Sequence, residues 1–416
     1  MTEQELEYWY RDFEAYQSRF AHHFSRSEPR EQAAKYVRGL LAPVKRKNGW
    51  QLAEAMGEEI PDPTQRLLYR STWEADAVRD TLQEFLEEEF GEADAIVVID
   101  ETGFLKQGEN SVGVHRQYCG TAGKVTNCQV ATFLGYLGSR GHVLLDRRLS
   151  LPQVWCEDKA RREAARIPAD LTFATKPRLA AEMLSQAWRR GIPMRWVTGD
   201  EVYGNAAFLR ETIDVGNCWY VLAVSATTPV WAERPAVEEP SAQTRRRLTA
   251  QTGGRHRTRS RLAADAPSPT TVAELVARWS PQRWKRLTVA LGEKGPRVYD
   301  WGFRRVVQTR RGLPGSEVWL VARRSVTDPQ SLAYYLSNAP PRTRLIQLAR
   351  VASSRFTIEQ CFEEAKGETG LDEYEVRTWH SWHRHITLSM MAYAWLSSIR
   401  AKAHEKGGTR IQPWLS

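Results

Sequence analysis

The sequence predicts an α/β protein in which a mixed sheet with flanking helices is interrupted by a β-rich insertion and framed by helical regions. Amphipathic helical stretches fill roughly the first ninety residues, β-rich and helical segments then alternate, and a second β-rich stretch follows. We expect an N-terminal helical region at 1–92, a core at 93–225 and 336–400, the insertion at 226–335 and a C-terminal tail at 401–416.

The N-terminal region is predicted to form amphipathic helices separated by proline-containing turns. The helical periodicity covers residues 4–20, 30–42, 47–56 and 72–90. Pro29, Pro43 and the turn "IPDPTQ" separate these stretches. The segment "GWQLAEAMGEE" weakly resembles part of a helix-turn-helix, and a plain helical bundle explains it equally well.

The core segments follow a defined order. Three strands are predicted at "AIVVID", "CQVATFLGYLG" and "HVLLDRRLSLP", and the last two form a hairpin around "SRG". Helices near 157–166 and 178–190, the strand "RWVTGD", a helix from about Asn205 and the strand "CWYVLAVS" come next. This is the order of an RNase H-like core, in which the following element is a helix that bears an acid.

The β-rich insertion separates that helix from the rest of the core. The stretches "RWKRLTVAL", "VYDWGFRRVV" and "EVWLVARRSV" alternate like antiparallel strands. A folded insertion explains this region better than a loop, because structureless loops of this length are rare inside compact domains. Helical character returns from Ser331 to the end of the chain.

The charge balance favours a polyanionic partner. Lys and Arg number 59 against 50 Asp and Glu, which gives a net charge of +9 and a pI near 9.3. From Ser241 to Arg261 the chain has seven Arg and no acid, a pattern typical of a loop that contacts a phosphate backbone or of a solvated linker. The seven are Arg245, Arg246, Arg247, Arg255, Arg257, Arg259 and Arg261.

Composition and segment patterns narrow the class of protein. No apolar run reaches the ~18 residues that a membrane span needs, and "ITLSMMAYAWL" is interpreted as a core helix. No secretory signal is visible, so we expect a cytoplasmic protein without a membrane partner. The five cysteines are odd in number and lack C-x-x-C spacing, which predicts reduced and mostly buried thiols.

Two predicted strands end in an acid, at Asp100 in "VVID" and at Asp200 in "WVTGD". A single acid at a strand end is usually a turn or cap residue. Two such strand ends side by side in this strand order instead form an anionic pocket suited to a divalent metal ion.

The third carboxylate is expected on the helix after the insertion, in "SSRFTIEQCFEEAKGETGLD". At about 100° per residue, Ile358, Cys361, Phe362 and Ala365 form one core-facing stripe. The side chains at the edge of this stripe are Arg355, Glu359 and Lys366, whereas Glu364 is expected to point about half a turn away, towards solvent. A surface helix with ion pairs is the alternative.

Aromatic and histidine residues offer weaker indications. Trp279, Trp284 and Trp301 are suited either to stacking on an extruded base or to packing within a small β domain. The histidines of "HSWHRH" favour packing or phosphate contact over metal binding, because suitably spaced Cys or acidic partners are missing.

These motifs together resemble the DDE transposases of bacterial insertion sequences, in the branch with a Y-R-E-K signature and a β-rich insertion before the glutamate. The stretches "DETGFLKQG", "GTAGKVTNCQV", "TGDEVYG" and "KGETGLDEYEVRTWHSWHRHITL" further resemble insertion-sequence family seven-oh-one. The resemblance covers roughly Leu40 to Leu396. The signature's tyrosine falls at Ala352, which departs from the family pattern.

The resemblance implies a catalytic and metal-binding triad of Asp100, Asp200 and Glu359, with Arg355 and Lys366 as phosphate contacts. Two Mg²⁺ ions, for which Mn²⁺ can substitute, would activate the attacking hydroxyl and stabilise the leaving oxygen. The implied function is a transposase that cleaves the ends of its mobile element and joins them to target DNA.

The implied partner is double-stranded DNA, bound by a homodimer on paired ends, and the implied location is the nucleoid. The helical region 1–92 is the candidate end-binding module, and Trp284 and the Arg-rich loop are further candidate DNA contacts. The alternatives are a domesticated transposase-derived DNA-binding or regulatory protein, and a stand-alone RNase H-like nuclease.

Overall fold

The computed structural model describes residues 3–239, 260–292 and 295–406, and the chain divides into two compact units. The first unit comprises residues 1–198 and 354–416, and the second comprises residues 199–353. The predicted α/β class, a mixed sheet with flanking helices and a β-rich insertion, is confirmed. The domain boundaries expected from the sequence stay a proposal.

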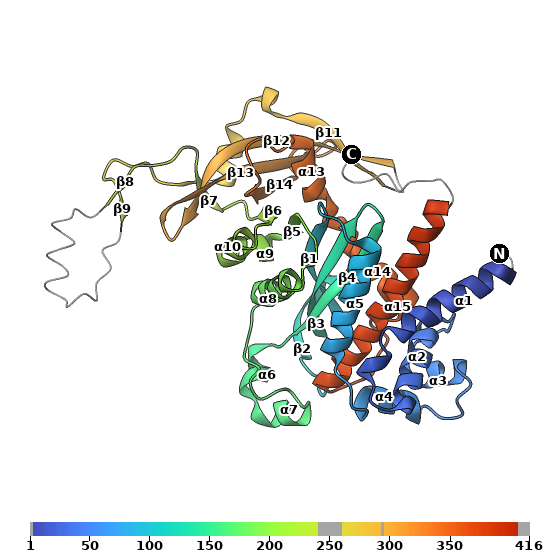
Figure 1. The fold of residues 1–416 in the computed structure, drawn as a ribbon. Helices are drawn as coiled ribbons and strands as arrows, with labels where there is room; N and C mark the ends of the chain where they lie inside the picture. Colours follow the sequence, from blue (N-terminus) through green and yellow to red (C-terminus); the bar gives the residue numbers. More distant parts are fainter. Residues whose placement is uncertain (1–2, 240–259, 293–294, 407–416) are drawn as a thin grey trace. The chain divides into compact units, whose positions relative to one another are not determined.

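The first unit contains a sheet and most of the helices (Figure 1). Its strands are β1 (Ile96–Leu105), β2 (His115–Cys119), β3 (Lys124–Gly138), β4 (Gly141–Ser150) and β5 (Trp196–Gly199), which ends at the unit boundary. Its helices are α1 (Glu3–Ser18), α2 (Ser27–Leu41), α3 (Gly49–Ala55), α4 (Asp62–Tyr69), α5 (Ala75–Phe90), α6 (Gln153–Glu157), α7 (Lys159–Ala164), α8 (Lys176–Arg189), α14 (Phe356–Thr369) and α15 (Trp379–Lys406).

The strand order of this sheet agrees with the predicted core. β1 lies between β5 and β3, and β4 pairs with β3, so that the predicted β3–β4 hairpin is confirmed. β1 and β3 are antiparallel, and Asp100 is the register partner of Phe133. β2 was not predicted, and it pairs with the first residues of β3.

Helices cover both faces of the sheet (Figure 1). α8 packs on β3 and β4 from one side, while α14 and α15 lie on the other side, as the ribbon shows. Residues 381–395 of α15 are all buried, which confirms that "ITLSMMAYAWL" is a core helix. Within the described ranges no helix has the length and apolar character that crossing a membrane requires.

The N-terminal helices pack against α15. The Tyr16 hydroxyl donates a hydrogen bond to the Met391 carbonyl at 2.8 Å, and the Tyr36 hydroxyl lies 2.8 Å from Nδ1 of His385. The four predicted helical stretches are confirmed, but α4 was read as a turn. Its proline lies in the first helical turn, where proline is compatible with a helix.

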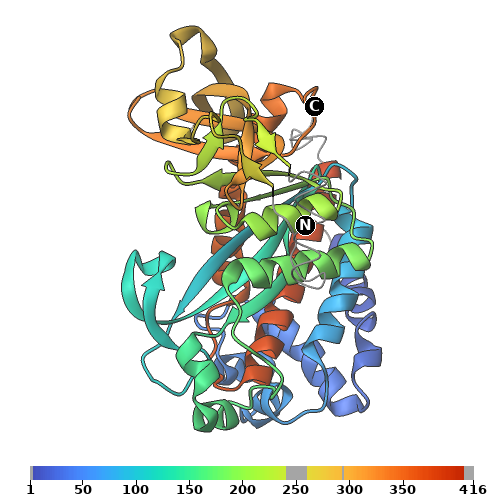
Figure 2. The same ribbon diagram turned by 90° about the vertical axis from the view of Figure 1, so that its left-hand side faces the viewer.

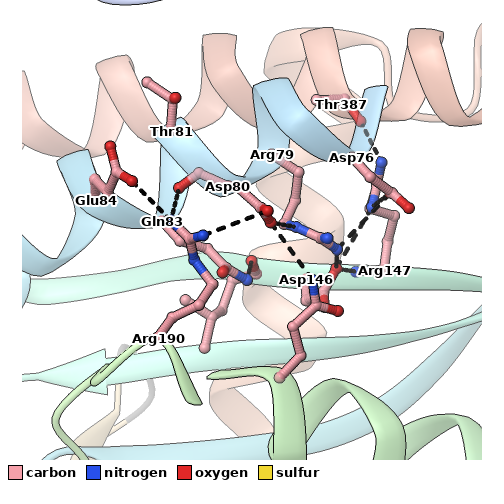
Figure 3. A network of polar contacts seen from close by, with 12 residues as sticks. Asp76, Arg79, Asp80, Thr81, Gln83, Glu84, Asp146, Arg147, Arg190 and Thr387 are labelled. Carbon is pink, nitrogen blue, oxygen red and sulfur yellow. Dashed lines mark hydrogen bonds and ion pairs between the residues drawn. The ribbon is translucent and has the colours of Figure 1, made fainter. Parts of the chain in front are cut away.

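A buried ionic cluster joins α5, β4 and α15 (Figure 3). Arg79 pairs with Asp146 and with Asp80, and Arg147 pairs with Asp76 and donates to the Thr387 hydroxyl at 2.8 Å. We name Arg79, Asp146 and Arg147 the buried cluster. Their side chains are at most 1% exposed, so this part of the unit is held together by desolvated charge pairs.

The second unit is mainly a β-sheet (Figure 2). Its strands are β6 (Trp219–Val224), β7 (Pro229–Trp231), β8 (Val237–Glu238), β9 (Arg261–Leu262), β10 (Thr270–Thr271), β11 (Lys285–Gly292), β12 (Gly295–Arg310), β13 (Leu313–Ser325) and β14 (Leu332–Ser337). Its helices are α9 (Glu201–Gly204), α10 (Ala207–Val215), α12 (Val272–Ala277) and α13 (Leu345–Ser354), and α13 ends at the unit boundary. Short 3-10 turns lie at Ala21–His23 and Gly120–Ala122 in the first unit and at Pro281–Arg283 in the second.

The strand order of the second unit is β10-β7-β12-β13-β14-β6, with β11 on β12 and a separate β8–β9 pair. The three predicted strands of the insertion are confirmed as β11, β12 and β13. The prediction that helical character returns at Ser331 is wrong. Residues 332–337 form β14 between β13 and β6, because "LAYYLS" has the aromatic and apolar residues that favour strands.

Candidate active site

Asp100 lies in the middle of β1, among the buried strands of the first unit. Its side chain is only 13% exposed. The Oδ1 atom accepts a hydrogen bond from the Glu101 backbone N–H at 2.8 Å. The prediction that an apolar strand carries this carboxylate is confirmed, but the prediction that the strand ends at Asp100 is wrong, because β1 continues five residues beyond it to Leu105.

Helix α14 packs across β1, β3 and β4 through its apolar stripe. Phe362 contacts Phe133, the register partner of Asp100, with ring centroids 5.4 Å apart. A Cβ atom on Gly135 would lie 3.2 Å from Cγ1 of Ile358, so the glycine permits a close approach of the helix. The stripe predicted from helical periodicity is buried, and it brings Glu359 to the region of Asp100.

Arg355 connects the two carboxylates. Its Nη1 atom lies 3.4 Å from Oδ2 of Asp100 and 3.4 Å from Oε1 of Glu359. The Arg355 side chain is 26% exposed and that of Glu359 is 56% exposed. We name Asp100, Arg355 and Glu359 the open cluster, because two acids share one guanidinium group and the side chains of Arg355 and Glu359 reach solvent.

Lys366 lies about two helical turns after Glu359 on α14, against the end of β1. Its Nζ atom donates to the Gly103 carbonyl at 3.1 Å and to the Thr121 hydroxyl at 3.3 Å. Burial lowers the pKa of this ammonium group, and the charge of Asp372 partly offsets the effect. The structure therefore brings together four of the predicted residues, namely Asp100, Arg355, Glu359 and Lys366.

Asp200 belongs to the second unit, where it caps a short helix. It is the N-cap of α9, and its Oδ1 accepts from the Val202 N–H at 2.9 Å. In the chain it directly follows β5, the strand beside β1 in the first unit's sheet. Within residues 3–239, 260–292 and 295–406, no three His, Cys, Asp or Glu side chains form a group that could hold a metal ion.

Glu101 faces a different neighbour from Asp100. Its Oε1 accepts from Nζ of Lys176, at the start of α8, at 2.6 Å. Successive side chains of a strand point to opposite faces, and α8 and α14 cover opposite faces of this sheet. The acid next to Asp100 is therefore used in an ion pair on the other face.

The prediction that Glu364 points to solvent is wrong. Its carboxylate accepts hydrogen bonds from the Tyr393 hydroxyl at 3.0 Å, from Arg400 Nη1 at 2.8 Å and from Gln360 Nε2 at 2.9 Å, and lies 3.3 Å from His142 Nε2. Burial opposes its ionisation, but these hydrogen bonds and the neighbouring His142 lower its pKa to about 2. Periodicity alone missed this because β4 and α15 cover that side of α14.

Two groups near Lys366 were not singled out from the sequence. The Thr121 hydroxyl lies within 3.5 Å of Gly103 O, Thr102 Oγ1 and Lys366 Nζ. Lys106 donates to the Tyr374 carbonyl at 2.8 Å, and burial lowers the pKa of Lys106 to about 8. A signal was present in the sequence, since residues 110–145 contain no acid.

The predicted DNA contacts of the insertion are described only in part. Arg245, Arg246, Arg247, Arg255, Arg257 and Arg259 lie outside the described residues. Arg261 is exposed in β9 and pairs with Glu238 at 2.9 Å. Trp284 is half-buried, with the Arg324 guanidinium 4.4 Å from its ring centre.

Several other expectations can be compared with the structure. Trp301 is fully buried, so it packs within the insertion and cannot stack on DNA. His383 and His385 are buried, and burial lowers the pKa of each to about 3, which confirms packing roles. All five cysteines are free, and four of them are buried. Ala352, at the signature's tyrosine position, is buried in α13.

Comparison with known families identifies the class of protein. The family model described as "DDE superfamily endonuclease" matches residues 19–296, more than half of the chain. The chain belongs to this endonuclease family. Asp100 and Asp200 lie inside the matched residues, whereas α14, with Glu359, lies beyond them.

A curated relative is more specific. The chain is 27% identical over 197 residues to the "Probable transposase for insertion sequence element IS701" of Microchaete diplosiphon, over 46% of this chain and 48% of that protein. The chain thus matches about half the length of this relative. The resemblance to DDE transposases of this insertion-sequence type is confirmed.

The similarity to solved structures is low, both in sequence identity and in TM-score. A piggyBac transposase synaptic complex with hairpin DNA has a TM-score of 0.42 and 11% identity, with 94% of this chain and 69% of that chain covered. The NurA nuclease from Sulfolobus solfataricus has a TM-score of 0.26 and 12% identity, with coverages of 68% and 80%.

Proposed function

We propose that this endonuclease is a DNA transposase that cleaves the ends of its own mobile element and joins them to target DNA. The observation that carries the proposal is the open cluster, in which Arg355 lies 3.4 Å from both Asp100 and Glu359. Membership in the DDE endonuclease family and the likeness to an insertion-sequence transposase support it.

We assign the catalytic carboxylates to Asp100, Asp200 and Glu359. Asp100 has a fixed position, because its strand is buried and its Oδ1 is held by the following backbone N–H. Glu359 is more exposed and lies one helical turn after Arg355, so it can rearrange when a ligand enters. Asp200 would complete the triad at the end of β5, next to β1 in the sheet order.

The two cations of α14 would bind the phosphate that is attacked. The Arg355 guanidinium can offset negative charge that develops on a phosphate held beside the two acids. Lys366 is half-buried and already directed by Gly103 and Thr121, so little side-chain freedom is lost when it binds an anion.

Family membership implies use of a divalent metal ion. The donor chemistry fits, because Asp100, Asp200 and Glu359 supply carboxylate oxygens, which hard cations such as Mg²⁺ prefer. We propose that these three residues hold two Mg²⁺ ions, with Mn²⁺ as a substitute. When bound, the ions would lower the pKa of an attacking hydroxyl and offset charge on the leaving oxygen.

The remaining assignments complete the proposal. Double-stranded DNA is the partner, bound by a homodimer on paired element ends at the nucleoid. The helices of residues 1–92 are candidates for end recognition, and Trp284 and the seven arginines from Arg245 to Arg261 are candidates for phosphate and base contact. The net charge of +9 agrees with such a partner.

The test is a cleavage and joining assay with the purified chain. DNA that carries the inverted repeats flanking the gene should be cut in Mg²⁺ or Mn²⁺, and its 3′-hydroxyl end should be joined to target DNA. Ca²⁺ should support binding without cleavage. Cutting without any metal, or no cutting of the correct ends, would contradict the proposal.

A further inference from the structure

The hairpin of residues 115–128, which comprises β2, the turn at Gly120–Gly123 and the start of β3, has two unlike faces. On one face Cys119 and Cys128 are fully buried. A Cβ atom on Gly103 would lie 2.3 Å from Sγ of Cys119, so only glycine allows the hairpin to sit this close to β1. Through this face the hairpin packs against Gly103 of β1, which is three residues after Asp100.

The opposite face exposes apolar side chains to solvent. Tyr118 and Val125 are register partners, so they lie directly across from each other on this face, and they are 64% and 55% exposed. Arg116, two residues before Tyr118, shares the face, whereas Lys124, the register partner of Cys119, belongs to the other face and is exposed at the turn. Folding does not require this apolar pair, because the other face of the hairpin already makes the contact with β1.

The charges of this segment favour a polyanion. Residues 110–145 contain no acid. Among the described residues, Arg116, Tyr118 and Lys124 make no side-chain hydrogen bond or ion pair. An exposed aromatic ring with an unpaired cation on the same face, and a second cation at the adjoining turn, is a combination suited to single-stranded nucleic acid, through base stacking and phosphate contact.

The turn of the hairpin is connected to the candidate active site. Thr121, in the turn, accepts a hydrogen bond from Lys366 Nζ at 3.3 Å, and its own hydroxyl donates to Gly103 O at 3.4 Å. The turn end of the hairpin therefore lies next to Lys366. In Figure 2 the teal strands that include this hairpin extend away from the helices of the unit.

We propose that the hairpin 115–128 binds the DNA strand beside the cleavage point, with Tyr118 and Val125 against unpaired bases and Arg116 and Lys124 on phosphates. The inference rests on the proposed function, and it adds a binding surface that the acid triad does not include.

The first experiment measures binding of a single-stranded oligonucleotide and of a random duplex by the full chain at several salt concentrations, in Ca²⁺. Arg116→Gln with Lys124→Gln should lower the slope of log K against log salt by about 1.4, because each phosphate contact contributes roughly 0.7 on a single strand. Tyr118→Ser should weaken single-strand binding about tenfold, which is within the range for one stacked base.

Matched controls come from the neighbouring helices. Val154 is 46% exposed and Lys159 is exposed, on α6 and α7. Val154→Thr and Lys159→Gln should leave both the slope and the affinity unchanged, whereas Val125→Thr should weaken single-strand binding. All of these variants change exposed side chains, so their melting temperatures should equal that of the wild type.

A crosslinking experiment locates the contact directly. With p-benzoylphenylalanine in place of Tyr118, light should join the chain to the bases next to the cut, and the same group in place of Val154 should give no adduct.

The outcomes separate the two proposals. Normal cleavage by wild type together with unchanged binding by the hairpin variants would overturn this inference and leave the transposase proposal standing. A change in oligomeric state with Tyr118→Ser, without loss of DNA binding, would show a contact between copies of the chain and would also overturn it. Absence of any DNA binding or cleavage by wild type would overturn both proposals.

Discussion

Two groups of carboxylate and guanidinium side chains in the first unit differ in solvent exposure and in the arrangement of their ion pairs. The buried cluster of Arg79, Asp146 and Arg147 has side chains at most 1% exposed. The open cluster of Asp100, Arg355 and Glu359 has side chains between 13% and 56% exposed. The same types of charged side chain are thus buried in one cluster and exposed to solvent in the other, within one unit.

The pairing differs as well. Asp146 lies within 4 Å of three guanidinium groups, those of Arg79, Arg147 and Arg148. Burial opposes ionisation of Asp146, but these cations lower its pKa. In the open cluster two acids share Arg355 at 3.4 Å, a distance typical of a loose contact. The comparison indicates that the first group is enclosed in the fold, whereas the second is accessible from solvent.

The largest difference is expected for activity. Asp100→Asn should lower the cleavage rate by at least about a thousandfold, on the order of the loss of a catalytic group, because a proposed metal ligand is removed. The adjacent acid is the control. Glu101→Gln removes an acid on the opposite face and should change the rate only a few-fold. Equal losses in the two variants, measured in single-turnover cleavage, would contradict the assignment of Asp100.

The buried cluster should respond in stability. Asp146→Asn leaves three buried or half-buried guanidinium groups without their shared anion, so the free energy of unfolding should fall by about 3–5 kcal/mol. Urea denaturation followed by circular dichroism measures this change. A loss below about 1 kcal/mol would mean that the cluster does not hold α5 and β4 together.

Glu364 should resemble the buried cluster more than the open one. Glu364→Gln weakens hydrogen bonds to Tyr393, Arg400 and His142 and should cost about 1–3 kcal/mol of stability. The exposed Glu363 provides the control, since Glu363→Gln should leave the melting temperature unchanged. Equal melting temperatures for the two variants would mean that Glu364 does not stabilise the fold and behaves as the solvent-exposed residue expected from periodicity.

A smaller effect should appear with pH. Burial, and next the charge of Arg147, lower the pKa of His383 to about 3, while Asp76 opposes the shift. Below about pH 6.5 this histidine is protonated in the unfolded chain but stays neutral in the folded chain. The free energy of unfolding is therefore highest above pH 6.5 and falls as the pH drops towards 3. The expected slope is about 1.4 kcal/mol per pH unit for this histidine.

The measurement is the free energy of unfolding at several pH values between 6.5 and 4.5. His383→Gln should reduce the slope in that window by about this amount, and the exposed His380 offers the control variant His380→Gln. An unchanged slope with His383→Gln would mean that this histidine is accessible to protons in the folded state.

Much of the open cluster followed from local patterns. The run "IVVID" predicted the buried strand that carries Asp100, although not its continuation to Leu105. The 3.6-residue period of α14 identified both the stripe of Ile358 and Phe362 and the edge position of Glu359. These inferences depend only on neighbouring residues. They succeeded because burial on a strand or helix is periodic.

Features that depend on distant parts of the chain were missed. Glu364 has partners on β4 and α15, more than 200 residues before it and about 30 after it. β14 pairs with β13 and β6, which come from other parts of the chain, and β2 lies where Gly103 of β1 leaves space for Cys119. Asp146 in "LLDRRL" gave no sign of burial, since its cations at Arg79 and Arg147 come from two elements.

The most direct test of the account compares two neighbouring glutamates of α14. Glu359→Gln should retain the melting temperature and DNA binding of wild type while cleavage of the element ends in Mg²⁺ falls by orders of magnitude, because a proposed metal ligand is lost. Glu363→Gln, exposed on the same helix, should cleave at the wild-type rate. Near-normal cleavage by Glu359→Gln, or an equal loss in both variants, would contradict the claim that Glu359 completes the catalytic triad.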